Sequence, residues 1–409
     1  MILTGQLVLE SAGETVHLAP GWLRIEDDRI AHVEIGETRD DADLGSPDHA
    51  ISPAFCDAHL HLPQFGVIGA YGLTLLDWLE RFVFPAEAWW EDVAFAHAMS
   101  ANVARSLLAH GTAGVAAYAT VHATSAQAAR EELAAHGLYG MVGHVLMDRG
   151  APPELVRPAA QLLDQTSAQR AAGRLSPAVT PRFAVSCSRE LLDGAGRLAR
   201  ESGLPVQTHL AETHEECDLV HRLFGETSYT SVYESAGLLT PRTLLAHAIH
   251  INDAERAAIA RAGAVAAHCP TANTFLRSGD MPLASHLTAG VRVALGSDVA
   301  GGPTPSMPLV ARAMIEAAWR SSDAVLTPAR AWWQITRGNA LAIGATESGV
   351  LRAGAHADLV VIHPFAGVWP EPQRSWMQHP DPLGAALFAW DPRWVRATIA
   401  AGVVRYQSR

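Results

Sequence analysis

Short apolar runs alternate with longer amphipathic stretches through most of this 409-residue chain. Between about residue 53 and residue 344, eight runs have the length of buried strands, and the stretches between them place apolar side chains at helical spacing. The expected strands are residues 55–59, 114–118, 139–146, 178–183, 205–209, 244–247, 264–268 and 291–295. The expected helices include residues 123–136, 189–202, 253–262 and 307–320. Eight successive strand–helix units predict an α/β fold, a (β/α)8 barrel of the TIM type.

The two ends of the chain show a different pattern, in which apolar and polar positions alternate as in half-buried strands. Examples are residues 22–26, 29–33 and 357–362. We therefore expect residues 1–52 and 345–409 to form one small β-sandwich together, and residues 53–344 to form the barrel. The least regular segment is residues 62–91, which follow the first barrel strand. Because loops at the carboxyl ends of barrel strands build the active site, we expect this segment to cover a bound substrate.

Composition narrows the class of protein. A hydrophobic content of 49% is typical of a soluble globular chain, and the N-terminal residues have neither a basic region nor a long apolar core. The four cysteines are widely spaced with no C-x-x-C motif, which favours a reducing cytoplasm over a disulfide framework. A net charge of −12 without a basic run argues against nucleic acid or an anionic membrane as the partner. The expected partner is a small neutral molecule.

All 30 basic residues are arginine, and the sequence contains no lysine. This excludes a Schiff-base lysine, a phosphate-loop lysine and the carbamylated lysine that bridges two metal ions in some hydrolases. Any metal site in the chain is therefore expected to hold one ion.

Histidines stand at the ends of several expected strands. His59 and His61 flank one leucine where the first apolar run ends, and alternate residues of a strand face the same side, so both imidazoles can bind one metal ion. Three later expected strands end in His209, His247 and Asp298. Chance does not readily place such residues at four strand ends.

The residue types indicate the chemistry. The imidazoles of His59, His61 and His209, with the carboxylate of Asp298, suit one zinc ion with a position left for water, and iron is a substitute. Bound zinc lowers the pKa of such a water to about 7, which makes hydroxide available near neutral pH.

Two further residues are candidate catalytic groups beside Asp298. Glu212 stands three residues after His209, close enough to act as a general acid and base without binding the metal. His247 can orient the water or stabilise the negative charge that develops on it. Taken singly, each of these residues has an ordinary explanation as a packed, solvent-facing or turn-forming side chain, but the ordered set at strand ends does not. His250, His268 and His286 receive no role.

The order of these motifs resembles the amidohydrolase superfamily over nearly the whole chain, and the missing lysine resembles its mononuclear deaminase branch. Several segments are similar to the guanine deaminase family in particular. They are His-Leu-Pro-Gln at 61–64, Gly-Ala-Tyr-Gly at 69–72, Leu-Asp-Trp-Leu-Glu at 76–80, Phe-Pro-Ala-Glu at 84–87, Thr-Pro-Arg-Phe at 180–183, Ser-Cys-Ser at 186–188, Ser-Tyr-Thr-Ser-Val-Tyr at 228–233 and Ser-Asp-Val-Ala-Gly-Gly at 297–302.

The resemblance implies a homodimeric, zinc-dependent enzyme of purine catabolism that hydrolyses guanine to xanthine and ammonia. It implies that Gln64 and Arg182 hydrogen-bond the purine, that Phe183 packs against its ring, and that Glu212 passes a proton to ring N3 as water attacks C2. An amide, a fork of donors and an aromatic face suit such a heterocycle. The alternative explanation for Arg182 is a structural salt bridge.

Two other functions stay open. The segment 271–276 differs from the family pattern at the active-site end of the barrel, so the substrate could be another aminated heterocycle, such as 8-oxoguanine, a pterin or a triazine. A non-catalytic scaffold that kept the fold is the third hypothesis. It is disfavoured because every expected ligand and the proton shuttle are present.

Overall fold

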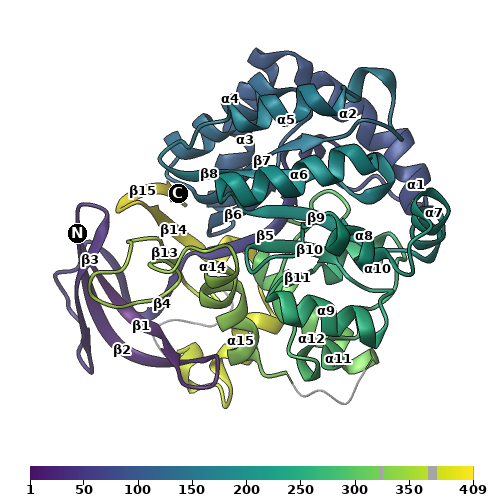
Figure 1. Ribbon diagram of the computed structural model, residues 1–409. Coiled ribbons are helices and arrows are strands. Elements are labelled where there is room, and N and C mark those ends of the chain that lie inside the picture. Colours follow the sequence, from purple (N-terminus) through teal and green to yellow (C-terminus); the bar gives the residue numbers. More distant parts are fainter. Residues whose placement is uncertain (322–325, 367–374, 409) are drawn as a thin grey trace.

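The structure, a computed structural model, describes residues 1–321, 326–366 and 375–408. It comprises a ring of parallel strands surrounded by helices, and a mixed sheet beside it in which strands from the two chain ends lie side by side (Figure 1). No helix in these described ranges is both long enough and apolar enough to cross a membrane.

Eight parallel strands form the barrel, in sequence order. They are β5 (Phe55–His61), β6 (Thr112–Tyr118), β7 (Tyr139–Leu146), β8 (Arg174–Pro181), β9 (Val206–Leu210), β10 (Thr243–His247), β11 (Val265–His268) and β12 (Arg292–Leu295). The predicted (β/α)8 barrel is confirmed. β8 begins at Arg174, where it pairs with β7, rather than at the predicted residue 178. The prediction missed these first residues because Ser176 and Pro177 interrupt the apolar pattern.

Backbone hydrogen bonds link β5 to the segment after β12. The N–H of Asp298 donates to the carbonyl of His59 at 2.8 Å, and the N–H of His61 donates to the carbonyl of Val299 at 3.1 Å. A Cβ atom at Gly296 would lie 2.5 Å from Cβ of His59, so this close approach requires glycine. The barrel therefore closes at the residues predicted to bind metal.

Helices connect the barrel strands and cover them. They are α3 (Val93–Ala109), α4 (Ala123–Ala135), α5 (Ala159–Ser167), α6 (Arg189–Ser202), α7 (His214–Phe224), α8 (Tyr229–Ser235), α9 (Asp253–Ala262), α10 (Pro270–Phe275), α11 (Leu283–Thr288), α12 (Met307–Ser321), α13 (Pro328–Trp333) and α14 (Asn339–Ala342). Local chemistry sets their ends: the hydroxyl of Ser188 accepts from the N–H of Leu191 at the start of α6, and Gly203, with φ of 67°, ends it.

The segment 62–91, expected to be the least regular, contains short helical turns, and residues 68–74 between the first two turns lie in neither a helix nor a strand. The turns are η1 (Leu62–Val67), α1 (Leu75–Trp78), η2 (Leu79–Val83), α2 (Phe84–Ala88) and η3 (Trp89–Glu91). Each turn is too short to show a helical period in the sequence, and interspersed Gly and Pro residues interrupt the pattern.

Both chain ends contribute to one seven-stranded mixed sheet, in the order β15-β14-β13-β4-β1-β2-β3. Its strands are β1 (Ile2–Ser11), β2 (Thr15–Glu26), β3 (Arg29–Ile35), β4 (Leu44–Pro53), β13 (Leu359–Ile362), β14 (Val395–Ala400) and β15 (Val403–Gln407), and α15 (Pro382–Phe388) precedes β14. The strands pair in one continuous order rather than in two separate sheets. The domain division at residues 52/53 and 344/345 stays a prediction, and 367–374 and 409 lie outside the described residues.

Candidate active site

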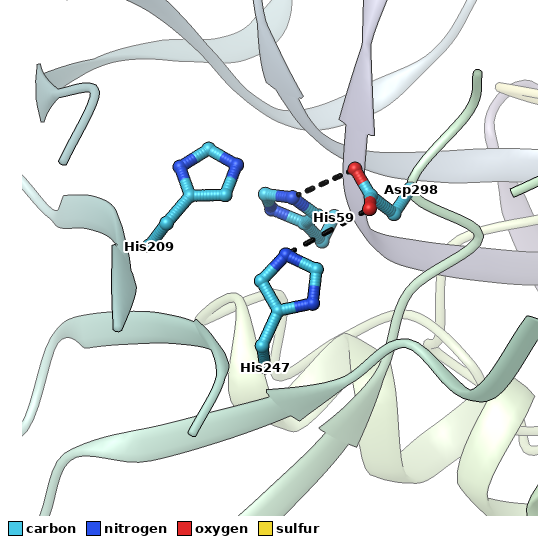
Figure 2. A group of neighbouring side chains, drawn as sticks. All are labelled: His59, His209, His247 and Asp298. Atoms are coloured by element: carbon cyan, nitrogen blue, oxygen red, sulfur yellow. Dashed lines mark ion pairs between the residues drawn. The ribbon is translucent and has the colours of Figure 1, made fainter. Parts of the chain in front are cut away.

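Four side chains converge at the carboxyl ends of the barrel strands: His59, His209, His247 and Asp298 (Figure 2). One potential ligand atom from each lies within 4.8 Å of the others. Nε2 of His59 is 3.2 Å from Oδ1 of Asp298, and Nε2 of His247 is 3.7 Å from Oδ2 of the same carboxylate. The barrel brings these residues together because parallel strands end at the same rim.

His61 belongs to the same cluster. Its Nε2 is 3.4 Å from Oδ1 of Asp298 and 3.1 Å from Nε2 of His209. The structure thus gathers the four predicted ligands, His59, His61, His209 and Asp298, and adds His247 as a fifth candidate.

The cluster fits a single divalent cation. Nε2 of His59 and Nε2 of His247 are buried without a hydrogen bond of acceptable geometry to any described residue. Burial lowers the pKa of the His59, His61 and His209 rings, that of His61 to about 3, so these imidazoles are neutral. Burial raises the pKa of Asp298, but the neighbouring rings outweigh it and lower this pKa well below its usual value. Neutral imidazoles and an ionised carboxylate are the forms that bind metal.

In two of the histidines, His209 and His247, the ring nitrogen that faces away from the cluster forms a hydrogen bond to the protein. Nδ1 of His209 donates to the carbonyl of Arg182 at 2.6 Å, and Nδ1 of His247 donates to Oδ1 of Asn273 at 2.9 Å. Such contacts set the tautomer and aim Nε2 at the centre. His247 and Asp298 also have positive φ angles of 70° and 48°, a backbone conformation that is uncommon outside glycine and often found at functional sites.

Glu212 lies beside this cluster on the segment after β9. Its Oε2 is 3.3 Å from Nε2 of His247, and its Oε1 accepts a hydrogen bond from the Ser278 hydroxyl at 2.7 Å. Burial raises the pKa of Glu212 to about 7. Burial lowers the pKa of His247, but the carboxylates of Glu212 and Asp298 outweigh it and raise this pKa. A buried carboxyl group with a pKa near neutrality is suited to proton transfer.

A pocket opens onto these groups and is lined by the predicted substrate contacts Gln64, Arg182 and Phe183. Leu75, Trp78 and Leu79 of the segment 62–91 line it as well, and cover of a bound substrate by this segment stays a prediction.

Two of the predicted substrate contacts also bond to protein. Oε1 of Gln64 accepts from the N–H of Ala300 at 3.1 Å. Arg182 forms a buried ion pair with Glu87, at 2.6 and 2.5 Å from Nη1 to the two carboxylate oxygens. The salt bridge considered for Arg182 is therefore present, yet the same side chain faces the pocket.

Sequence reasoning did not find four residues that support the site. Asn273 and Ser278 hold His247 and Glu212, and Glu87 holds Arg182. Asp57 accepts from the N–H of His59 at 3.2 Å and from the N–H of Ser297 at 2.9 Å. Only Asp57 had a usable signal, because it alternates with the two histidines on β5 and so shares their face.

The fold and this site define the class of protein. The model of the amidohydrolase family matches residues 50–405, so the chain belongs to the amidohydrolase family. It is 35% identical to a guanine deaminase from Dictyostelium discoideum over 290 residues, which are 69% of this chain and 64% of that protein. It is also 35% identical to a probable guanine deaminase from Deinococcus radiodurans over 349 residues, 82% of this chain and 79% of that one. The crystal structure of guanine deaminase from C. acetobutylicum, with guanine bound in its active site, superposes with a TM-score of 0.91 at 28% identity and covers 99% of both chains.

Proposed function

We propose that this chain hydrolyses guanine to xanthine and ammonia. The observation that carries the proposal is one pocket in which Gln64, Arg182 and Phe183 face Glu212 and the histidine–aspartate cluster. The similarity to guanine deaminases, one of them with guanine bound, supports the same conclusion.

The proposed cofactor is one Zn²⁺ per chain, held by His59, His61, His209 and Asp298, with Fe²⁺ as the alternative. His247 is close enough to join this set. When bound, such a cation supplies Lewis-acid activation of a water molecule.

The chain's own residues would position the base and move the proton. Phe183 packs against the purine, while Gln64 and Arg182 hydrogen-bond its polar edge. His247 and Asp298 orient the attacking water, whose oxygen forms a bond to C2. Glu212 carries one proton of this water to ring N3. The second proton moves from the new C2 hydroxyl to the exocyclic amine through Glu212, and the bond from C2 to the amine then breaks, which leaves a carbonyl at C2 and releases ammonia.

The deciding experiment is ammonia release from guanine beside 8-oxoguanine, adenine, a pterin and melamine, with zinc and iron quantified in the protein. Selective release from guanine with about one metal per chain is the expected result. A metal-loaded protein that is silent on guanine but turns over another panel member would overturn the substrate while keeping the deaminase chemistry.

The role of Glu212 gives a first prediction. Glu212→Gln removes the proton shuttle but keeps the side-chain volume, so we expect kcat to fall by roughly 10²–10⁴ with the metal content unchanged. Glu215→Gln is the matched control, because Glu215 is exposed on the neighbouring turn. Near wild-type deamination by a metal-replete Glu212→Gln variant would remove Glu212 from this role.

We further propose a homodimer in the cytoplasm with a role in purine catabolism. The dimer and the catabolic role rest on the resemblance to guanine deaminases. The cytoplasm is supported by the four cysteines, which are all free thiols. Sedimentation at several protein concentrations tests the dimer.

A further inference from the structure

Glu87 contacts the substrate pocket through Arg182. Glu87 belongs to α2, in the segment that covers the pocket, whereas Arg182 directly follows β8. Both carboxylate oxygens accept from the single nitrogen Nη1 of Arg182, at 2.6 and 2.5 Å. The side chains are 4% and 3% exposed, so this ion pair is buried.

The rest of the guanidinium is left for a ligand. Nε and Nη2 of Arg182 have no hydrogen-bond partner among the described residues, and Arg182 lines the pocket. Phe84, also on α2, lies with its ring centroid 5.5 Å from Cζ of Arg182. Helix α2 therefore fixes the guanidinium with a carboxylate and an aromatic ring while two donor groups stay unused.

Arg182 and Glu87 carry opposite charges, and this pairing affects which ligands the pocket can bind. A buried guanidinium without a partner is strongly unfavourable and attracts an anion. Glu87 compensates that charge and does not line the pocket, so Arg182 offers its donors to the pocket without adding a net positive charge. Such a pocket suits a neutral base that presents acceptor atoms.

We propose that Glu87 is a positioning residue that makes the pocket selective for neutral purines over anionic purines. This inference rests on the proposed function, since guanine is the neutral purine in question. Glu87 acts through Arg182, since Arg182 lines the pocket and Glu87 does not.

The test compares a neutral and an anionic purine on the metal-loaded enzyme. Urate is a purine that is a monoanion at neutral pH. In Glu87→Gln the amide oxygen still accepts from Nη1, so Arg182 stays in place while its charge is no longer cancelled. We expect urate to bind about tenfold more tightly, with KM for guanine changed by less than about threefold. A merely structural role would weaken both ligands together, and urate binding that is unchanged or weaker would overturn the proposal.

Further variants separate charge from position. Glu87→Asp keeps the negative charge, so we expect it to bind urate as weakly as wild type does. Glu91→Gln is the matched control, because Glu91 is an exposed carboxylate on the next helical turn, and both ligands should bind it as they bind wild type. If Glu87→Gln does not fold, the double variant Glu87→Gln/Arg182→Gln replaces the ion pair by two amides and should bind urate no better than wild type. A gain in urate binding by the double variant would contradict the role of Arg182.

Direct calorimetric titration with urate keeps the two proposals distinguishable. A wild-type protein that does not deaminate guanine would refute the proposed function, while the effect of Glu87 on urate binding would still be measured.

Discussion

Ser278 holds Glu212, the proposed proton shuttle, through one hydrogen bond. Its hydroxyl donates to Oε1 of Glu212 at 2.7 Å, and both side chains are buried. A hydrogen bond to a charged group contributes about 1.5–3 kcal/mol, so we expect Ser278→Ala to lower kcat roughly 10- to 100-fold with little change in KM. Steady-state kinetics on metal-loaded protein measure this. Ser278→Thr should recover part of the loss, and Ser285→Ala, at an exposed position on α11, is the control. A fall in kcat/KM that comes entirely from KM would contradict this role.

Asn273 acts on His247 in a comparable way. Its Oδ1 accepts from Nδ1 of His247 at 2.9 Å, which aims Nε2 at the cluster. Loss of such a partner lowers metal affinity or activity about 10- to 100-fold, and we expect Asn273→Ala to do so. Competition with a chelator gives the metal affinity independently of turnover. Thr274→Ala, exposed on the same helix, should retain wild-type affinity, and equal affinities for all three proteins would refute the assignment.

The residues of the candidate site that lie at the ends of barrel strands could be predicted from the sequence. His59, His61, His209, His247 and Asp298 follow apolar runs, and the barrel rule places them at one rim. Apart from Asp57, the supporting residues lacked a signal in the sequence, because their partners are close only in space. Ser278 is 66 positions from Glu212, and Glu87 is 95 positions from Arg182.

Most strands and helices were predictable because the spacing of apolar residues along the chain shows which face of each element is buried. Long periodic stretches such as α6 and α9 have the predicted bounds, because apolar spacing over several turns identifies a buried face. The segment 62–91 was not predictable, since its one-turn helices are stabilised by contacts such as that of Trp78, whose Nε1 donates to the carbonyl of Ala70 at 2.8 Å.

Strand β7 carries a buried histidine, His144, that we expect to make the barrel less stable in acid. Nδ1 of His144 lies 2.8 Å from Oγ1 of Thr166, and Nε2 lies 2.9 Å from the carbonyl of Val121. Burial lowers the pKa of His144 to about 4. The unfolded chain, with a histidine pKa near 6.5, binds this proton first, so stability falls as the pH drops from about 6.5 to about 4.

His144→Gln should therefore reduce the loss of stability in acid. His144 lowers the free energy of unfolding by about 2 kcal/mol at pH 5 relative to pH 8, and we expect this decrease to be absent from the variant. Urea unfolding at both pH values gives the difference. His97→Gln, at a surface position, should keep the wild-type pH dependence, and an unchanged slope in His144→Gln would exclude His144 as the source.

An ion pair between Arg174 and Asp358 joins the barrel to the terminal sheet. Arg174 begins β8, and Asp358 immediately precedes β13, 184 positions later. The two guanidinium nitrogens donate to the two carboxylate oxygens at 2.7 and 2.6 Å. Burial lowers the pKa of Arg174, but the hydrogen bonds to Asp358 outweigh it and raise this pKa. The carboxylate also accepts from the N–H of Ala401 at 3.0 Å, so one side chain ties together β8 and two segments of the C-terminal region.

Asp358→Asn tests whether this pair couples the two parts of the molecule. Asp358 is buried and Arg174 is partly buried, so removing the carboxylate charge leaves the guanidinium poorly compensated, and we expect a loss of about 3 kcal/mol in the free energy of unfolding. Glu316→Gln breaks a half-exposed pair with Arg312 on α12 and should cost less than about 1 kcal/mol. The Arg174 pair lies at the amino ends of the strands, opposite the pocket, so kcat and KM at 25 °C should stay at wild-type values. Because the Arg174–Asp358 ion pair connects the barrel to the terminal sheet, we expect these two parts of the wild-type protein to unfold in one transition. Unfolding of Asp358→Asn at wild-type stability would mean that the terminal sheet is held by its apolar contacts with the barrel rather than by this ion pair.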